Sequence, residues 1–155
     1  MRQTVYSAQR RNSSVMLSGL INQSYLDVAV PRATVRAASW PTLLVVDGDA
    51  SLAQILVCFF ERRGFHVAAA GSIAEARDYF HRRKIWTLVI ADYHLPDGTA
   101  WELYNWMRDQ HCDTPMLLMS GSPHCATLCA GMDYFAKPFP LEKLEAYVRM
   151  LPREG

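Results

Sequence analysis

The chain has 155 residues, half of them hydrophobic, and a formal net charge of +1. This length fits one domain of common size and is sufficient for a single hydrophobic core. No apolar run approaches the ~18 residues of a membrane span, and four cysteines are too few for a disulfide framework, so the reducing cytoplasm is the expected location.

Residues 1–40 differ in composition from the rest of the chain. They contain five arginines and one acidic residue, Asp27, which leaves 11 of the 16 basic and 14 of the 15 acidic side chains to the other 115 residues. The mildly acidic remainder argues against nucleic-acid binding through the folded part. We expect residues 1–40 to be a poorly ordered extension with one short helix around residues 15–21. An organelle transit peptide, or a start site assigned too far upstream, would also account for this segment.

From Pro41 onward, apolar runs of strand length alternate with segments whose apolar residues recur at helical spacing. The expected strands cover residues 42–46, 65–70, 87–91, 116–119 and 133–136. The expected helices comprise one ending at Gly64, one from the capping box of Ser72 and Glu75 to about residue 83, one ending before Asp113, a short one at 124–130 and a last one at 141–151. Strands this apolar are expected to be covered on both faces, which predicts a three-layer α/β sandwich.

Four of the apolar runs lead into a polar residue of a particular kind. These residues are Asp47, Asp92, Ser120 and Lys137. If the strands are parallel neighbours, the four side chains gather at the carboxyl edge of one sheet, where ligands bind in open α/β sheets. Two carboxylates, a hydroxyl and an ammonium predict a site for a divalent cation and a phosphoryl group. In a simpler interpretation, the aspartates only cap the following helices and Ser120 only belongs to a turn.

Four sequence anchors carry a resemblance to a known family: VVDGDASL, ADYHLPDG, MSGS and AKPF. Their order, and the 45 positions that separate Asp47 from Asp92, are typical of response regulator receiver domains, the relatives of CheY. Residues 41–152 therefore resemble a receiver domain of two-component signalling systems. The resemblance implies a doubly wound, flavodoxin-like (βα)5 fold with a five-stranded parallel sheet in the order 2-1-3-4-5.

The resemblance also implies roles for the residues at the sheet edge. Asp92 would be the phosphoacceptor, whose carboxylate attacks the phosphorus of a phosphohistidine. Lys137 and Ser120 would stabilise the charge of the phosphoryl group. Tyr134 would swing inward as the Ser120 hydroxyl moves, although a core aromatic is the simpler interpretation of this residue.

A Mg²⁺ ion is the implied cofactor, held by Asp47, Asp92 and the backbone carbonyl of His94. Receivers usually carry two adjacent acids after the first strand, and the second is a direct metal ligand in the family. Here Asp47 is followed by Gly48, and the next acid is Asp49. We therefore expect Mg²⁺ to bind weakly, unless Asp49 reaches into the site.

A second departure from the family is the 17-position spacing between Ser120 and Lys137, which is shorter than receivers generally have. The fourth helix would then hold only about two turns. In the family this helix belongs to the face that dimers and partners contact, so we expect phosphorylation not to drive dimerisation through that face.

The expected function is that of a stand-alone receiver in the cytoplasm, not an enzyme. It would accept a phosphoryl group on Asp92 from a histidine kinase or a histidine phosphotransfer protein and signal by contact with a protein target, with no nucleic-acid or membrane partner. The alternative is a degenerate receiver that acts as an interaction module without phosphorylation, which Gly48 favours. A flavodoxin-like enzyme or flavin carrier is disfavoured, because the acidic loop at residues 47–50 would repel a ligand phosphate.

Two smaller motifs have simple interpretations. Asp97 lies in the sequence Pro-Asp-Gly at residues 96–98, which indicates turn chemistry and not a ligand. A soft metal site could be imagined from His and Cys residues, but their spacing matches no standard zinc pattern. These residues are His111, Cys112, His124, Cys125 and Cys129.

Overall fold

The computed structural model of the chain describes residues 41–82, 85–122, 124–125 and 132–152. The expected extension at residues 1–40 and most of the expected fourth helix at 124–130 lie outside the described residues. In chain order the elements are β1 (Thr42–Val46), α1 (Ala50–Glu61), β2 (His66–Ala70), α2 (Ile73–Arg82), β3 (Leu88–Asp92), β4 (His94–Leu95), β5 (Gly98–Thr99), α3 (Ala100–Asp109), β6 (Met116–Ser120), β7 (Asp133–Ala136) and α5 (Leu141–Met150).

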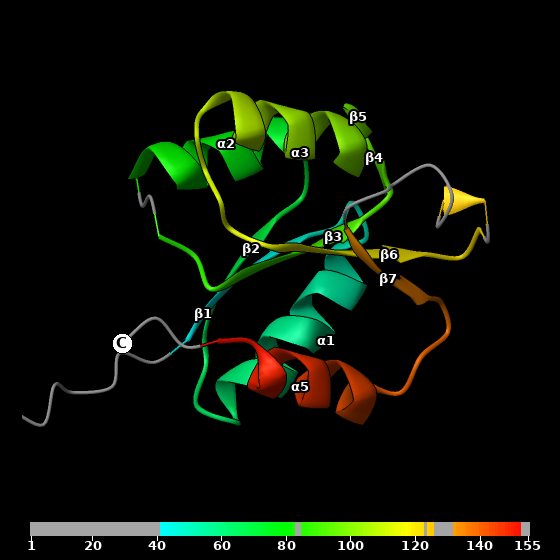
Figure 1. Cartoon of the computed structure of the whole chain (residues 1–155). Coiled ribbons are helices and arrows are strands. Elements are labelled where there is room, and N and C mark those ends of the chain that lie inside the picture. Colours follow the sequence, from blue (N-terminus) through cyan, green and yellow to red (C-terminus); the bar gives the residue numbers. More distant parts are fainter. Residues whose placement is uncertain (1–40, 83–84, 123, 126–131, 153–155) are drawn as a thin grey trace, which may run out of the picture. The chain divides into compact units, whose positions relative to one another are not determined.

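The main sheet has five parallel strands in the order β2-β1-β3-β6-β7. Because β4 and β5 form a separate antiparallel hairpin, β6 and β7 are the fourth and fifth strands of this sheet, and the expected order 2-1-3-4-5 is confirmed. The helices α2 and α3 lie on one side of the sheet and α1 and α5 on the other (Figure 1). This is the expected three-layer, doubly wound α/β fold.

Each strand of the sheet supplies side chains alternately to two hydrophobic clusters, because successive residues of a strand point to opposite faces. In β1, Leu44 and Val46 pack in the cluster under α2 and α3, whereas Leu43 and Val45 pack in the cluster over α1 and α5. All four side chains are fully buried. The continuous apolar run of β1 is thus explained by burial on both faces.

The two edge strands contribute to both clusters but are covered less completely than the central strands. The middle residues of β2 and β7 are only partly buried, and the first residue of each strand is exposed. Each edge strand has a neighbour on one side only, so fewer side chains pack over it. The apolar composition of a strand therefore does not predict how deeply the strand is buried, since β2 and β7 share this composition with β1 and β3.

Local boundaries also differ from the sequence-based expectation. The first helix ends at Glu61, before the expected Gly64, and Gly64 with a φ of 84° turns the chain toward β2. The hairpin of β4 and β5 was not expected; it is closed by the turn at Pro96 and Asp97, between the phosphoacceptor candidate and α3. Over the residues that the structure describes, none of the helices is both long and apolar enough to span a bilayer.

Candidate functional site

The carboxyl edge of the sheet brings three of the four expected side chains into direct contact. Lys137, which follows β7, places its Nζ 3.2 Å from Asp47 Oδ2 and 3.0 Å from Asp92 Oδ1. Asp47 follows β1 and Asp92 ends β3, and these two strands are neighbours in the sheet. The lysine ammonium therefore bridges two carboxylates that are 45 positions apart in the sequence.

The exposure of these side chains differs in a way that suits different roles. Asp47 is 2 % exposed, while the side chains of Asp92 and Lys137 are 20 % and 25 % exposed. Asp47 is held from both sides, because its Oδ1 also accepts a 2.9 Å hydrogen bond from the Asp49 amide. Asp92 is the carboxylate that a reactant could reach from solvent. Two carboxylates and one ammonium give this cluster a net charge of −1, which attracts a cation.

Ser120, the fourth expected residue, ends β6 and is 1 % exposed. Its Oγ accepts a 3.1 Å hydrogen bond from the Ser122 amide and donates a 3.3 Å hydrogen bond to Cys125 Sγ. The backbone carbonyl of Ser120 accepts a 2.8 Å hydrogen bond from the Lys137 amide, which ties the ends of β6 and β7 together.

Tyr134 is connected to the same segment through its hydroxyl. This group lies 3.1 Å from the Ser120 carbonyl oxygen and 3.0 Å from the Ser122 carbonyl oxygen, and it can donate to either. The ring is partly buried and packs against the cluster under α2 and α3. The tyrosine thus contacts the loop that carries the serine, and its expected role as a switch stays a prediction.

Gly48 and Asp49 occupy the positions after Asp47, and the structure gives each a distinct environment. Asp49 is the N-cap of α1, and its Oδ1 accepts hydrogen bonds from the Ser51 and Leu52 amides at 2.9 and 3.2 Å. In this position the Asp49 carboxylate serves the helix, which does not favour the expectation that it reaches the metal. Gly48 lies against the Pro96 ring, and a Cβ added to it would come within 3.0 Å of Pro96 Cδ.

Asp97 has a role that its sequence context did not reveal. Its Oδ1 and Oδ2 accept hydrogen bonds from the Ile73 and Ala74 amides at 2.8 and 2.9 Å, so it caps α2 from another part of the chain. The hydrogen bond from Ile73 is the largest cause that lowers the pKa of this carboxyl from its ordinary value. The hairpin that carries His94 is therefore fixed to the start of α2.

The expected capping box at the start of α2 is partly wrong. The Ser72 hydroxyl accepts from the Glu75 amide at 3.2 Å as expected, but Glu75 Oε2 accepts from the Gly71 amide at 2.7 Å and not from Ser72. The reciprocal capping box occurs instead at α3, between Thr99 and Glu102. Sequence spacing identifies the capping chemistry but not which amide each side chain reaches.

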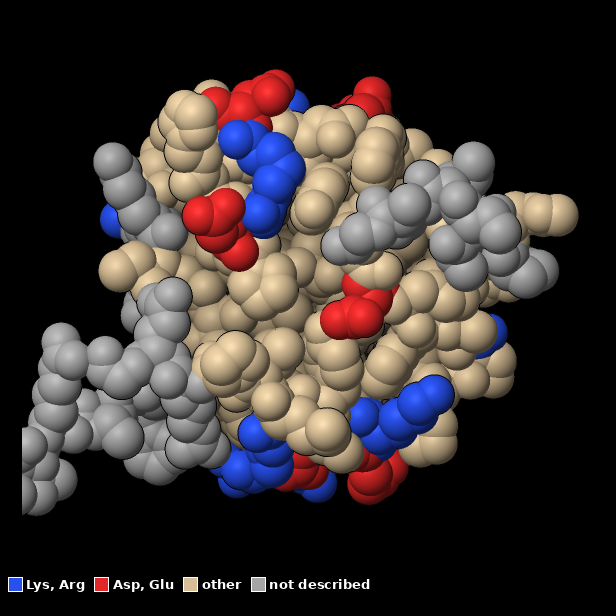
Figure 2. Space-filling view, viewed as in Figure 1, with Lys and Arg blue, Asp and Glu red and all other residues tan. Residues whose placement is uncertain are grey.

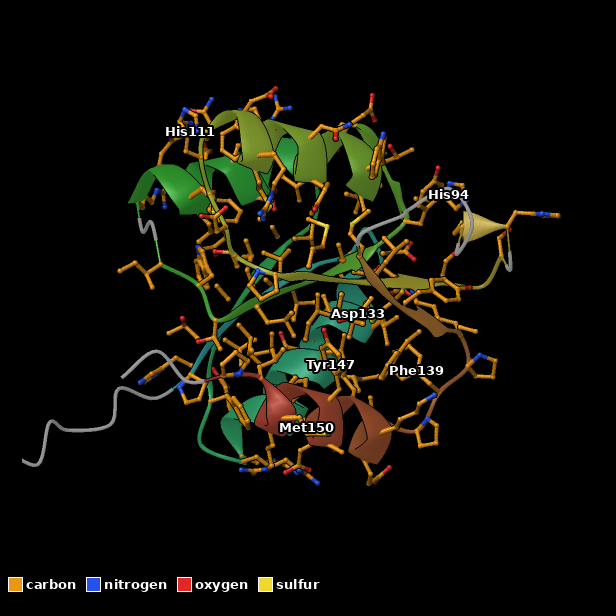
Figure 3. The ribbon with its side chains drawn as sticks, in the orientation of Figure 1. His94, His111, Asp133, Phe139, Tyr147 and Met150 are labelled. Atoms are coloured by element: carbon orange, nitrogen blue, oxygen red, sulfur yellow. The ribbon has the colours of Figure 1, made fainter. Side chains whose placement is uncertain are left out.

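The oxygen atoms at the sheet edge suit Mg²⁺, which prefers carboxylate, carbonyl and water ligands. Asp47 and Asp92 contact the same Lys137 Nζ, so their carboxylates lie within reach of one cation. His94, whose backbone carbonyl is the third expected ligand, lies on the hairpin after Asp92 (Figure 3). Within the described ranges, no group of three or more His, Cys, Asp or Glu side chains is placed to hold a metal. The two carboxylates that contact Lys137 are those of Asp47 and Asp92, and Gly48 contributes none.

The imagined soft metal site gains no support from the positions of its candidate ligands. His111 and Cys112 lie between α3 and β6, whereas His124 and Cys125 follow β6, so the two pairs flank this strand from opposite ends. Cys112 Sγ contacts the Thr114 hydroxyl at 3.4 Å, and Cys125 is buried against Ser120. Cys129 lies outside the described residues.

Comparison with known proteins identifies the family to which this architecture belongs. The family model described as "Response regulator receiver domain" matches residues 43–149. The chain belongs to this family. The receiver is 32% identical over 118 residues to the transcriptional regulatory protein PmrA of Pectobacterium parmentieri, which covers 73% of this chain and 53% of that protein. It is 31% identical over 118 residues to the acid tolerance regulatory protein ActR of Rhizobium meliloti, which covers 73% and 60%.

Solved receiver structures agree with this assignment. The receiver domain of the Francisella response regulator 1452 has a TM-score of 0.64 and 28% identity, covering 72% of this chain and 95% of that one. CheY4 of Vibrio cholerae, with a TM-score of 0.66 and 22% identity, covers 74% and 100% and shows the same fold. The chain spans little more than half the length of PmrA and 60% of ActR. Receivers are signalling modules, and what the full-length relatives regulate is a property of those proteins.

Proposed function

We propose that residues 41–152 form a receiver domain that accepts a phosphoryl group on Asp92 from the phosphohistidine of a histidine kinase or a histidine phosphotransfer protein. The observation that carries this proposal is the Lys137 ammonium, which lies between Asp47 and Asp92 at 3.2 and 3.0 Å. A fixed cation beside a partly exposed carboxylate is the arrangement that phosphoryl transfer to that carboxylate requires.

The reaction forms a bond between an Asp92 carboxylate oxygen and phosphorus and breaks the bond between phosphorus and the imidazole nitrogen of the donor. The electron pair of the broken bond remains on the imidazole, and the product is an acyl phosphate. Lys137 can follow the negative charge from the carboxylate to the phosphoryl oxygens because its ammonium carries three donors. Asp47 keeps the lysine close, since its own Oδ2 is one of the two partners of Nζ.

A bound Mg²⁺ would neutralise charge on the phosphoryl oxygens. We propose that Asp47, Asp92 and the His94 carbonyl would hold it, more weakly than in receivers with a second adjacent acid. The proposed downstream partner is a protein, and a cytoplasmic location accords with a two-component pathway. On the face shown in Figure 2, acidic and basic side chains of the described residues are interspersed, unlike the one-sign basic face of many nucleic-acid-binding domains. That the receiver acts alone stays a prediction.

A degenerate receiver without phosphorylation is the second candidate function, and the observation that favours it is Gly48, which stands where receivers usually carry the second adjacent acid. The test is treatment of the chain with a small-molecule phosphodonor, with and without Mg²⁺, followed by mass spectrometry. We expect one added phosphoryl group that depends on Mg²⁺ and disappears in Asp92→Asn. Asp113→Asn, at a fully exposed side chain, is the matched control and should be modified as the wild type is. An unmodified wild-type chain would support the degenerate receiver, and unchanged modification of Asp92→Asn would refute the assignment of Asp92.

A further inference from the structure

The Ser120 hydroxyl lies in a closed hydrogen-bonded arrangement that includes a buried thiol. Ser120 is 1 % exposed and Cys125 is 3 % exposed. Ser120 Oγ donates to Cys125 Sγ at 3.3 Å and accepts from the Ser122 amide at 3.1 Å. The backbone that carries the thiol is held in turn, because the Cys125 amide donates to the Ser122 carbonyl at 3.2 Å.

This arrangement limits what the Ser120 hydroxyl can donate to. A serine hydroxyl has one hydrogen to donate and accepts with its lone pairs. The Ser122 amide occupies an acceptor position and leaves the donor unaffected. The single hydrogen is directed to Cys125, so Ser120 can donate to a phosphoryl group on Asp92 only after it breaks its hydrogen bond to the thiol.

On the basis of the proposed phosphorylation of Asp92, we propose that Cys125 is a positioning residue that holds the Ser120 hydroxyl in its resting orientation. Sulfur is a weak acceptor, so the hydroxyl is retained but released at small cost. The strength of this one hydrogen bond then sets how readily the hydroxyl turns toward the phosphoryl group.

The Tyr134 hydroxyl extends the effect of this hydrogen bond beyond the serine. Tyr134 contacts the carbonyl oxygens of Ser120 and Ser122, and the Ser122 carbonyl also accepts from the Cys125 amide. A change at the thiol is therefore transmitted to the same short loop that the tyrosine contacts. This places Cys125 between the serine and the aromatic side chain that the family couples to it.

A packing role is the competing explanation, because Cys125 belongs to the buried cluster under α2 and α3. The two explanations predict different responses to substitution. If the thiol only fills space, Cys125→Ser and Cys125→Ala should both disturb the site in the same direction. If it holds the hydroxyl, serine should hold more firmly than cysteine because oxygen is the stronger acceptor, and alanine should not hold at all.

The test measures binding of beryllofluoride, a mimic of the phosphoryl group, in the presence of Mg²⁺. We expect Cys125→Ala to bind it about threefold more tightly and Cys125→Ser about threefold more weakly, the low end of the effect of one hydrogen bond. Cys112→Ala removes a partly buried thiol whose contact is Thr114 and should leave the affinity unchanged. In a Ser120→Ala background, both effects of Cys125 substitution should vanish.

Equal affinities in all three Cys125 forms, or shifts that persist in Ser120→Ala, would overturn the inference. Failure of the wild type to bind beryllofluoride would overturn the proposed function instead, and a second measurement then decides the inference by itself. Amide hydrogen exchange at Ser122, which donates to Ser120 Oγ, should be faster in unliganded Cys125→Ala than in wild type. Unchanged exchange at Ser122 would show that the thiol does not position the hydroxyl.

Discussion

Replacing Gly48 by Asp restores the adjacent acid that other receivers carry, and the structure shows that Pro96 stands in the way. The Gly48 backbone is compatible with a side chain, since its φ lies outside the left-handed region in which Gly64 and Gly98 are found. The added Cβ would, however, lie 3.0 Å from Pro96 Cδ and 3.1 Å from Pro96 Cγ. The proline ring must therefore give way by a few tenths of an ångström.

Two effects decide the outcome: the attraction between the added carboxylate and Mg²⁺, and the steric cost of the added side chain to folding stability. Opposite unit charges at 4 Å attract by about 1 kcal/mol in water. Gly48 is exposed, so this lower limit applies, and a doubly charged cation gains about 2 kcal/mol, or roughly thirtyfold in affinity. The steric contact costs about 1 kcal/mol of folding stability, because the hairpin that carries Pro96 is also held to α2 by Asp97. We expect Gly48→Asp to bind Mg²⁺ more tightly and to unfold more easily.

The assay is calorimetric titration of Mg²⁺ into wild type, Gly48→Asp and Gly48→Asn, with urea unfolding of the same proteins. Asparagine has nearly the shape of aspartate and no charge, so it reports the steric effect alone. Adding Pro96→Ala should recover the lost stability in both variants without changing the difference between them. Equal Mg²⁺ affinities for the aspartate and asparagine variants would refute the reasoning and would mean that Asp49, or no second acid, completes the site.

Three further predictions concern stability and assembly. Asp97→Ala should lose about 1 kcal/mol of stability with the α2 cap, whereas Asp97→Asn should lose less, because its single amide oxygen can keep one of the two hydrogen bonds. The pKa of Asp97 is lowered in the folded state. Wild type should therefore be more stable than Asp97→Asn at pH values above the ordinary carboxyl pKa, and this difference should be lost as the pH falls through the lowered pKa. Urea unfolding at neutral and acidic pH measures the difference. Tyr134→Phe should cost about 1 kcal/mol in urea unfolding through the lost hydroxyl contacts while leaving the extent of Asp92 phosphorylation unchanged, and loss of phosphorylation would contradict this. Sedimentation should reveal no phosphorylation-dependent dimer through α5; such a dimer, broken by substitution of the exposed Glu142 or Arg149, would contradict the expected effect of the short Ser120 to Lys137 segment.

The fold could be predicted from the sequence because its main signals are local. Apolar runs such as Leu43–Val46 identify strands, and helical spacing identifies the elements between them. The strand order was not available from these patterns and came from the resemblance. The lower burial of β2 and β7 relative to the central strands could not be predicted. A strand lies at the edge because of the neighbours it acquires, and its own composition does not determine this position.

The candidate site shows a similar division. The positions of Asp47, Asp92, Ser120 and Lys137 followed from the rule that parallel strands end at one edge. The contacts of Asp97 with α2, Pro96 with Gly48 and Cys125 with Ser120 join residues through the tertiary structure. Turn chemistry explained Asp97 well enough that nothing in its local sequence called for a second role. For Cys125, the sequence signal was a cysteine five positions after the serine. Sequence alone does not distinguish a cysteine that positions the serine from one that only packs in the core.

The alternation of β1 side chains between the two hydrophobic clusters makes the strand intolerant of a change in its length. Deleting one residue from β1 would exchange the partners of Leu43 to Val46, so that each side chain met the wrong helical layer. It would also draw Asp47 to the place of Val46, opposite Ala70 and Ala91. There the carboxylate would be enclosed by alanines in place of a lysine. The length of β1 therefore determines both the packing of the core and the position of Asp47. A deletion of one residue would disrupt both at once.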